Sequence, residues 1–311
     1  MHTALLFPGQ GSQKVGMGRA VAEAFAEARA VFEEADDALG FAISKLCFEG
    51  PEEELTRTAN TQPAILTTSI AVLRALQARV PLAFDAAAGH SLGEWTALVA
   101  TGALRLGDAV RLVRLRGEAM QRAVPEGVGA MAAIVGLDGD RVAALCAEAS
   151  TGAEVCSPAN LNGGGQVVIS GHTPAVDRAM AAAKAAGARL VRKLAVSAPF
   201  HCALMQPAAD ALADALAPVE VRAPAVPVYA NVTAEPHGDP DAIKARLVDQ
   251  VTAPVQWERT VQRMAAAGMR RAYEVGPGRV LAGLVKRIAP DVAVAGVAEP
   301  EDIDNLARAE G

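Results

Sequence analysis

The sequence predicts an α/β protein in which a parallel sheet lies between helices and a smaller ferredoxin-like α+β subdomain is inserted. Short apolar runs alternate with helical patterns along most of the chain, as is typical of parallel sheets. A G-x-S-x-G pattern at residues 89–93 follows one of these runs and opens into a helical pattern, as in an α/β-hydrolase-like domain. Between residues 130 and 194 the order becomes strand, helix, strand, strand, helix, strand, which indicates a ferredoxin-like unit.

Length, composition and charge exclude several classes of protein. The 311 residues, 51% of them hydrophobic, can bury one large core or two smaller ones. The net charge of −6, with 29 basic and 35 acidic residues interspersed, argues against a nucleic-acid partner. The cysteines lie far apart without a C-x-x-C pair, so we expect reduced thiols, no structural metal and no disulfide frame. Because neither a signal-peptide pattern nor a run of 18 apolar residues occurs, we expect a cytoplasmic protein without a membrane partner.

The first elements in chain order are a strand over residues 3–7 and helices over residues 17–39 and 63–79. A polar segment, residues 51–61, separates the two helices. The loop over residues 8–13 contains two glycines, which permit close approach of backbone N–H groups to a bound group, as an oxyanion site needs. An ordinary strand-to-helix turn would have the same pattern, so both interpretations stay open.

Ser91 is the candidate nucleophile. A buried strand is predicted over residues 84–88 and a helix over residues 92–100, so the serine lies at the turn between them. Gly89 and Gly93 would let strand and helix pack closely around a sharp turn that exposes the hydroxyl. The helix N-terminus also favours developing negative charge. Chance supplies G-x-S-x-G in roughly one chain in ten of this length, so the strand and helix around it carry the prediction.

Arg116 is unusual within the next helical pattern, residues 108–121. On a helical projection it falls inside the apolar stripe, whereas Arg111 and Arg114 lie on the solvated side. An arginine cannot lose its proton to escape burial, so it needs an anionic partner, a set of carbonyls or a ligand carboxylate. The pattern alone leaves an internal salt bridge and a substrate carboxylate equally open.

The inserted subdomain is predicted over residues 128–195, and the large domain over residues 1–127 and 196–311. Residues 160–166 contain three glycines and no lysine of a P-loop, which favours a hairpin turn between the middle strands. The predicted elements are strands at residues 130–137, 154–161, 166–170 and 188–194, and helices at residues 140–149 and 174–186.

A base for the nucleophile must come from the five histidines of the chain. His2 is terminal, and His172 and His237 lie in polar segments that predict turns. His90 adjoins the serine, and adjacent residues at a strand-to-helix turn point in different directions. His201, between an apolar run and a helical pattern, is therefore favoured as the base, although a lone histidine is more often structural.

Two more buried strands are predicted beyond His201, over residues 226–231 and 271–275. The second is followed by a Gly-Pro-Gly turn and a helix over residues 279–288. Strands that alternate with helices in this way indicate a parallel sheet.

Six sequence blocks in this order resemble the malonyl-CoA:acyl carrier protein transacylases of fatty-acid synthesis, over nearly the whole chain. The blocks are residues 7–13, 89–94, 116–121, 201–207, 231–233 and 274–278. The resemblance departs at Gly163-Gly164, where a small residue and proline are common, and at Trp95, where other aromatics are common.

The resemblance implies a role for each candidate residue. Ser91 would be acylated by malonyl, His201 would be its general base, and a main-chain carbonyl of Gln250 would orient His201. Arg116 would hold the free malonyl carboxylate, with Asn160 as a further substrate-binding residue. The oxyanion hole would be formed by two backbone N–H groups, those of Gln10 and Leu92. No metal or bound cofactor would be required, since CoA and phosphopantetheine thioesters are the substrates.

The expected partners are malonyl-CoA and acyl carrier protein, and a monomer is expected, although the sequence leaves the oligomeric state open. Three alternatives remain. An α/β-type serine hydrolase or thioesterase would share the G-x-S-x-G turn, but its usual chain order places an acid between serine and a C-terminal histidine. The other two are an acyltransferase for another acyl-CoA in polyketide synthesis and a non-catalytic carrier-protein docking module.

Overall fold

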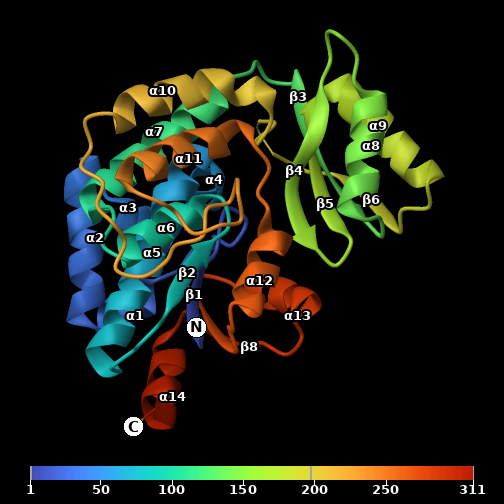
Figure 1. Cartoon of the computed structure of the whole chain (residues 1–311). Coiled ribbons are helices and arrows are strands. Elements are labelled where there is room, and N and C mark those ends of the chain that lie inside the picture. The colour runs from blue at the N-terminus through green and yellow to red at the C-terminus, as the bar shows by residue number, and fades with distance from the viewer. Residues whose placement is uncertain (1, 197, 311) are drawn as a thin grey trace.

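Two sheets, one parallel and one antiparallel, form the frame of the molecule and lie side by side (Figure 1). The structure, a computed structural model, describes residues 2–196 and 198–310, so Ser197 in the predicted segment before His201 lies outside the described residues. The predicted α/β fold with a second α+β unit is confirmed.

The parallel sheet has the strand order β2-β1-β7-β8, with every neighbouring pair parallel. Side chains alternate along a strand, so Leu5 and Phe7 of β1 pack on one face of the sheet and Ala4 and Leu6 on the other. All four are fully buried, which explains why β1 is a continuous apolar run. The strands are β1 (Thr3–Phe7), β2 (Ala86–Gly89), β7 (Arg271–Val275) and β8 (Ala293–Val297).

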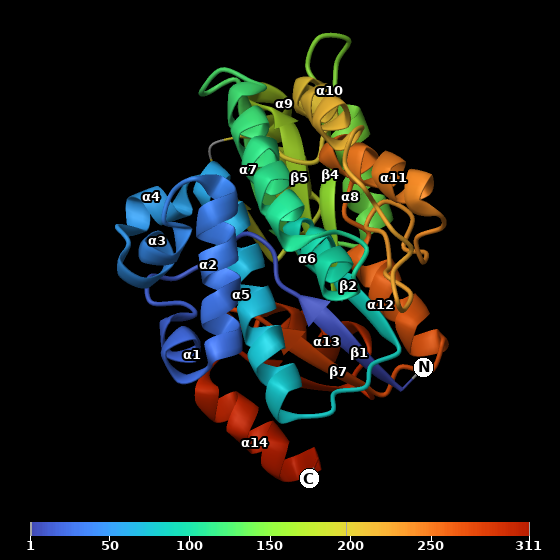
Figure 2. The same ribbon diagram turned by 90° about the vertical axis from the view of Figure 1, so that its left-hand side faces the viewer.

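Helices cover both faces of this sheet. On the face of Ala4 and Leu6 lie α12 (Trp257–Ala266) and α13 (Val280–Ile288). The helices that pack on the other side are α1 (Arg19–Ala24), α2 (Ala26–Leu39), α3 (Ile43–Glu49), α4 (Glu52–Thr56), α5 (Thr58–Arg79), α6 (Leu92–Ala100), α7 (Leu106–Arg122), α10 (Gln206–Leu216), α11 (Pro240–Thr252) and α14 (Pro300–Glu310). Figure 2 shows α2, α5 and α7 side by side. No helix in the described part of the chain is long and apolar enough to cross a membrane.

The antiparallel sheet has the order β4-β5-β3-β6, and one of its faces is covered by two helices (Figure 1). Its elements follow each other along the chain as predicted. They are β3 (Gly129–Val135), α8 (Gly139–Ala149), β4 (Cys156–Gly163), β5 (Gln166–His172), α9 (Thr173–Ala185) and β6 (Leu190–Lys193). The predicted hairpin joins β4 to β5, but its turn is confined to Gly164 and Gly165, with φ of 61° and 71°. A two-residue hairpin turn with both φ values positive favours glycine at both positions.

Two predicted elements are wrong in detail. The helical pattern over residues 17–39 forms two helices, α1 and α2, because Phe25 between them has an extended backbone. The apolar run over residues 226–231 forms no strand and makes only isolated bridges at Val228 and Tyr229. The bridge at Val228 joins the run to Ala87 at the edge of the parallel sheet, but Pro227 has no N–H to donate, which limits the pairing to this one position.

Some other elements have different bounds from those predicted, and some were not predicted. The polar segment at residues 51–61 contains α4 and the first turn of α5, so Pro63 lies inside α5 near its start. As the sixth residue of α5, Pro63 has no N–H to donate to the carbonyl of Ala59 one turn earlier, so the helix lacks one backbone hydrogen bond there. The strand β8 and the helix α14 were not predicted from the sequence.

Candidate active site

The turn that contains the candidate nucleophile Ser91, called the nucleophile turn below, lies at the carboxyl ends of two adjacent parallel strands. β1 ends at Phe7 and β2 ends at Gly89, and the register pairs these two residues directly. The loop that contains Gln10 and the turn that contains Ser91 therefore emerge side by side. Carboxyl ends of parallel strands are the usual location of ligand sites in open α/β sheets.

Close packing explains the glycines around Ser91. A Cβ on Gly93 would lie 2.1 Å from the carbonyl oxygen of Phe7, and a Cβ on Gly89 would lie 2.0 Å from the carbonyl carbon of Gly93. β1, β2 and α6 thus meet where no side chain fits. Ser91 itself has φ of 50° and ψ of −105°, a conformation that non-glycine residues rarely adopt. The predicted sharp turn between strand and helix is present.

His201 is the histidine that contacts the nucleophile. Its Nε2 lies 2.8 Å from Ser91 Oγ, and its Nδ1 lies 2.8 Å from the main-chain oxygen of Gln250. A carbonyl oxygen can only accept, so Nδ1 carries the hydrogen and Nε2 is left as the acceptor for the serine hydroxyl. The tautomer that a general base requires is therefore fixed by a main-chain group.

The environment of His201 keeps its ring neutral. Burial is the main cause that lowers the pKa of His201 to about 3, and the nearby positive charge of Arg116 acts in the same direction. The hydrogen bond to Gln250 opposes both effects. At neutral pH the imidazole is therefore free to accept a proton from Ser91.

The other histidine near the nucleophile, His90, points elsewhere. Its Nε2 lies 2.8 Å from Asn162 Oδ1, and its ring centroid lies 5.7 Å from that of Trp257. Burial lowers the pKa of His90 as well. The structure thus places His201, and not His90, against the serine hydroxyl.

Arg116 reaches into the same site from α7 with only 1% of its surface exposed. Nη1 donates to Gln62 Oε1 at 2.7 Å, and Nη2 donates to Gln250 Oε1 at 2.9 Å and to Ser91 Oγ at 3.2 Å. Its Nε is buried and has no hydrogen-bond partner among the described residues. Of the partners that the sequence left open, the structure thus supplies amide carbonyls rather than an internal salt bridge.

A buried polar network behind the nucleophile was not predicted. Glu94, fully buried in α6, accepts from the N–H of Asn231 at 2.9 Å and from Gln250 Nε2 at 2.7 Å. Its other oxygen lies 2.8 Å from His237 Nε2. Asn231 Oδ1 in turn accepts from the N–H of Ser91 at 2.7 Å.

His237 lies in an irregular segment with exposed neighbours, as predicted, but its own ring is buried against Glu94, which the sequence did not indicate. The polar residues around position 237 in the sequence concealed this burial. A glutamate in the first turn of an otherwise apolar helix was the one available signal, since α6 is buried along almost its whole length.

Gln10 and Asn160 line a cavity of about 150 Å³ together with Ser91, Arg116 and His201. Gln10 comes from the loop after β1, and Asn160 comes from β4 beside a bulge. Bulges commonly redirect a side chain next to a site. A second cavity of about 270 Å³ shares Gln10 and Asn160 with the first and extends to α13. Leu92 is the first residue of α6, where a helix leaves its N–H groups without intrahelical acceptors.

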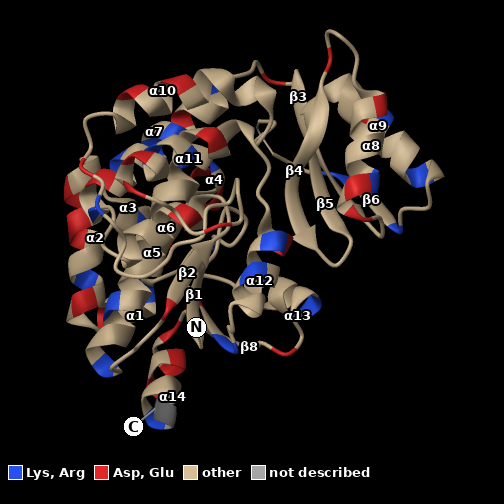
Figure 3. Ribbon diagram, in the orientation of Figure 1, with Lys and Arg blue, Asp and Glu red and all other residues tan. Residues whose placement is uncertain are grey.

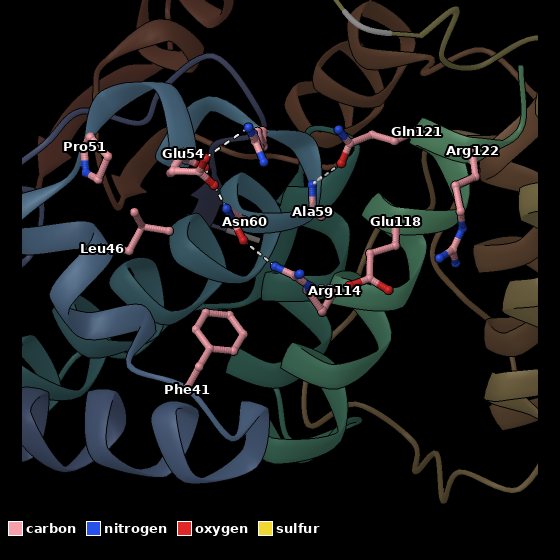
Figure 4. A pocket seen from close by; sticks show the side chains of 11 residues that line it. Phe41, Leu46, Pro51, Glu54, Ala59, Asn60, Arg114, Glu118, Gln121 and Arg122 are labelled. Carbon is pink, nitrogen blue, oxygen red and sulfur yellow. Dashed lines mark hydrogen bonds and ion pairs between the residues drawn. The ribbon is translucent and has the colours of Figure 1, made fainter. Parts of the chain in front are cut away.

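A different pocket, of about 660 Å³, contains none of the candidate residues (Figure 4). It lies between α3, α4, α5 and α7, and two of its three arginines pair with carboxylates: Arg57 with Glu54, and Arg114 with Glu118. Within residues 2–196 and 198–310, no group of three or more His, Cys, Asp or Glu side chains could hold a metal ion.

The chain is similar to known acyltransferases over its whole length. Residues 4–309 match the family model described as acyl transferase domain. The malonyl CoA-acyl carrier protein transacylase of Escherichia coli (strain K12) is 52% identical over 297 residues, 96% of each chain. The protein of that name from Bacillus subtilis is 45% identical over 301 residues, 97% of this chain and 95% of the relative.

The solved structures that this chain resembles include malonyltransferases. The acyl-carrier-protein-S-malonyltransferase of Bartonella henselae superimposes with a TM-score of 0.96 at 47% identity and covers 100% of both chains. A malonyl-transacylase solved in complex with a type II PKS acyl-carrier protein gives a TM-score of 0.96 at 45% identity, over 99% of this chain and 100% of that one. The chain therefore belongs to the malonyl-CoA:acyl carrier protein transacylases of the acyl transferase domain family.

Proposed function

We propose that this enzyme transfers a malonyl group from malonyl-CoA to the phosphopantetheine thiol of the acyl carrier protein of fatty-acid synthesis, through an acyl-enzyme on Ser91. The observation that carries the proposal is the contact of Ser91 Oγ with both His201 and Arg116. A serine with a neutral base can form an ester, and a buried guanidinium 3.2 Å from its oxygen suits an acyl group that ends in a carboxylate.

In the first half-reaction Ser91 Oγ attacks the thioester carbonyl carbon while its proton passes to His201 Nε2. The carbon–sulfur bond then breaks, and the protonated imidazole returns the proton to the CoA sulfur. The carbonyl of Gln250 keeps His201 in the required tautomer throughout, because its oxygen accepts from Nδ1.

The tetrahedral intermediate carries negative charge on the former carbonyl oxygen. We assign its stabilisation to the backbone N–H groups of Gln10 and Leu92, which belong to the two segments that meet beside Ser91. Leu92 supports this role because its N–H lies at the first position of α6, where the helix dipole is also favourable.

In the second half-reaction the thiol of the carrier protein repeats the attack on the Ser91 ester, with His201 as base and Ser91 as leaving group. Asn160, which lines both cavities, is assigned to substrate binding. Every proton and bond is accounted for by the chain and its thioester substrates, so the proposed reaction needs no cofactor. We also propose a cytoplasmic location, since the four cysteines are free and buried, as suits a reducing compartment. The monomeric state stays a prediction.

The proposal is tested by intact-protein mass measurement after incubation with malonyl-CoA and with acetyl-CoA. We expect a malonyl adduct on the wild type and none on Ser91→Ala, and a labelled Ser91→Ala variant would contradict the assignment. In Arg116→Ala the ratio of kcat/KM for malonyl over acetyl should fall about 10- to 100-fold, because charge-assisted hydrogen bonds contribute about 1.5–3 kcal/mol. If both activities fall together at a constant ratio, Arg116 is structural.

A further inference from the structure

Arg116 is held by neutral groups, although it is a buried cation. A buried arginine normally needs a carboxylate within contact, because an unpaired charge is costly in the interior. Here the groups that contact its guanidinium are the amide oxygens of Gln62 and Gln250 and the hydroxyl of Ser91. The guanidinium can only donate, so both amides must present their oxygen and not their nitrogen.

The compensating negative charge lies one amide further away, on Glu94. Gln250 stands between the two charges: its Oε1 accepts from Arg116 at 2.9 Å, and its Nε2 donates to Glu94 Oε2 at 2.7 Å. The charge of Glu94 acts to raise the pKa of Arg116, against the lowering by burial. Glu94 therefore stabilises the cation electrostatically without occupying any of its N–H donors.

Arg116 keeps N–H donors that its contacts within the protein do not use, and a substrate carboxylate needs such donors. Nε has no partner among the described residues, Nη1 makes one hydrogen bond, and the contact of Nη2 with Ser91 Oγ involves the atom that becomes acylated. Two parallel hydrogen bonds to a carboxylate can form from such donors once an acyl group is on the serine.

We propose that Gln62 and Gln250 are specificity-determining positioning residues. Their neutral amides hold the Arg116 guanidinium in place without neutralising its charge, so that this charge can bind the carboxylate of the acyl group. This inference rests on the proposed function, because it requires that Arg116 binds the malonyl carboxylate. Its physical content is that amide and carboxylate, although nearly isosteric, are not interchangeable at position 62.

A carboxylate at position 62 would convert the hydrogen bond at 2.7 Å into a direct ion pair. Inside a cavity of low dielectric, the carboxylate at position 62 would compete with the malonyl carboxylate for Arg116 and would also repel it. Acetyl carries no charge and escapes both effects. The substitution Gln62→Glu should thus change the choice of acyl group rather than the chemistry at Ser91.

The test is the ratio of kcat/KM for malonyl-CoA over acetyl-CoA at pH 8, in variants whose folding is checked by circular dichroism and thermal unfolding. We expect Gln62→Glu to lower this ratio by about 10- to 100-fold, the range for loss of a charge-assisted pair. Gln62→Met removes the hydrogen bond that holds Arg116 Nη1 but adds no charge, so it should lower the ratio by a smaller factor. A merely structural role would lower both activities and leave the ratio constant.

Asn60→Asp is the matched control. Asn60 lies on α5, the same helix as Gln62, and its amide oxygen accepts from Arg114 of α7, but this pair lies in the pocket outside the active-site cavity (Figure 4). The control makes the same amide-to-carboxylate change beside Arg114, which lies on α7 as Arg116 does. The malonyl-to-acetyl ratio should be unchanged.

The outcomes separate the inference from the function on which it rests. A lowered ratio in both Arg116→Ala and Gln62→Glu supports both. A lowered ratio in Arg116→Ala with a wild-type ratio in folded Gln62→Glu overturns the inference alone, whereas a wild-type ratio in Arg116→Ala overturns the role of Arg116 itself. Should Gln62→Glu fail to fold, Gln62→Met decides, because a wild-type ratio in that variant also overturns the inference.

Discussion

At the scale of single residues, the site depends on two side chains whose backbones are in a region that favours glycine. Ser91 has φ of 50° and His201 has φ of 58°. Such conformations cost on the order of 1–3 kcal/mol each and persist where the surroundings enforce them. The Ser91 N–H bond to Asn231 and the His201 Nδ1 bond to Gln250 are two of the enforcing contacts. The strain places Oγ and Nε2 in contact before any substrate binds.

The candidate residues Ser91 and Arg116 could be identified from the sequence, but the polar network that holds them could not. Ser91 lies in a recognisable strand-to-helix turn, and Arg116 interrupts the apolar stripe of a helix. Glu94 stands out as a glutamate in an apolar helix, but nothing in the sequence marks His237 as its partner, which lies 143 positions away. Only folding brings the two residues together, so a buried hydrogen-bonding partner that lies in a polar segment cannot be recognised from one sequence.

The first prediction distinguishes the two histidines at the nucleophile turn. His201→Ala should lower the rate of acyl-enzyme formation by about 10²–10⁴-fold, because the base that accepts the Ser91 proton is lost. His90→Ala should lower it much less and should lower the melting temperature instead, since His90 packs on Trp257 and bonds Asn162. Stopped-flow or quenched acylation, together with thermal unfolding, measures both. Equal rate losses in two equally stable variants would mean that the assignment of the base is wrong.

At the scale of elements, the site is a consequence of how closely α6 crosses β1 and β2. Most of the central elements could be predicted because their apolar periodicity is strong, as in β1 and α6, whose bounds agree with the prediction. β8 was missed because it is an edge strand with alternate exposed positions and only Val297 fully buried. α14 is largely polar and shows a core contact only through Ile303 and its neighbours.

The second prediction concerns the crossing of α6 with β1. Gly93→Ala should destabilise the protein by about 1–3 kcal/mol and lower acylation, because its Cβ would lie 2.1 Å from the Phe7 carbonyl oxygen and must push α6 away. Gly283→Ala is the matched control in another helix, α13, where an added Cβ meets nothing within 4 Å. That variant should be neutral or stabilised by up to about 1 kcal/mol, as alanine replaces glycine in a helix.

Urea unfolding and acylation rates of the two glycine variants give the comparison. The expected result is a large difference between two chemically identical substitutions. If Gly93→Ala is as stable and as active as Gly283→Ala, the close approach of β1 and α6 does not constrain the nucleophile turn.

At the scale of the whole molecule, the cavity lies between the turns that follow β1 and β2 and the antiparallel sheet, with Gln10 and Ser91 on one side and Met131 and Asn160 on the other. We propose residues 128–195 as the inserted subdomain, because its sheet and its two helices enclose a core of their own. The opposite face of that sheet contributes Met131, Ala159 and Val168 to the core of the large domain. A bridge between Asn160 and Val255 also extends the sheet across the boundary. A substrate in this cavity is therefore contacted from both sides.

Charge is distributed over the surface without a one-signed face in this view, with Lys and Arg beside Asp and Glu along most helices (Figure 3). Ion pairs such as Arg178 with Glu154 and Lys193 with Asp177 are exposed and contribute little stability individually. The electrostatic features that matter for stability are instead the buried ones around the cavity.

The last prediction follows from the buried histidine at the centre of the molecule. Burial lowers the pKa of His201 to about 3 in the folded protein, whereas histidine in an unfolded chain titrates near 6.5. Between these values the unfolded chain binds a proton that the folded one does not, so the free energy of unfolding falls as pH falls. One such group contributes at most about 1.4 kcal/mol per pH unit. Urea unfolding at several pH values from 7.5 to 4 should therefore show a smaller loss of stability in His201→Gln than in the wild type. Carboxylates contribute equally to both proteins and cancel in the comparison, so identical pH slopes would contradict the burial of a neutral imidazole beside Ser91.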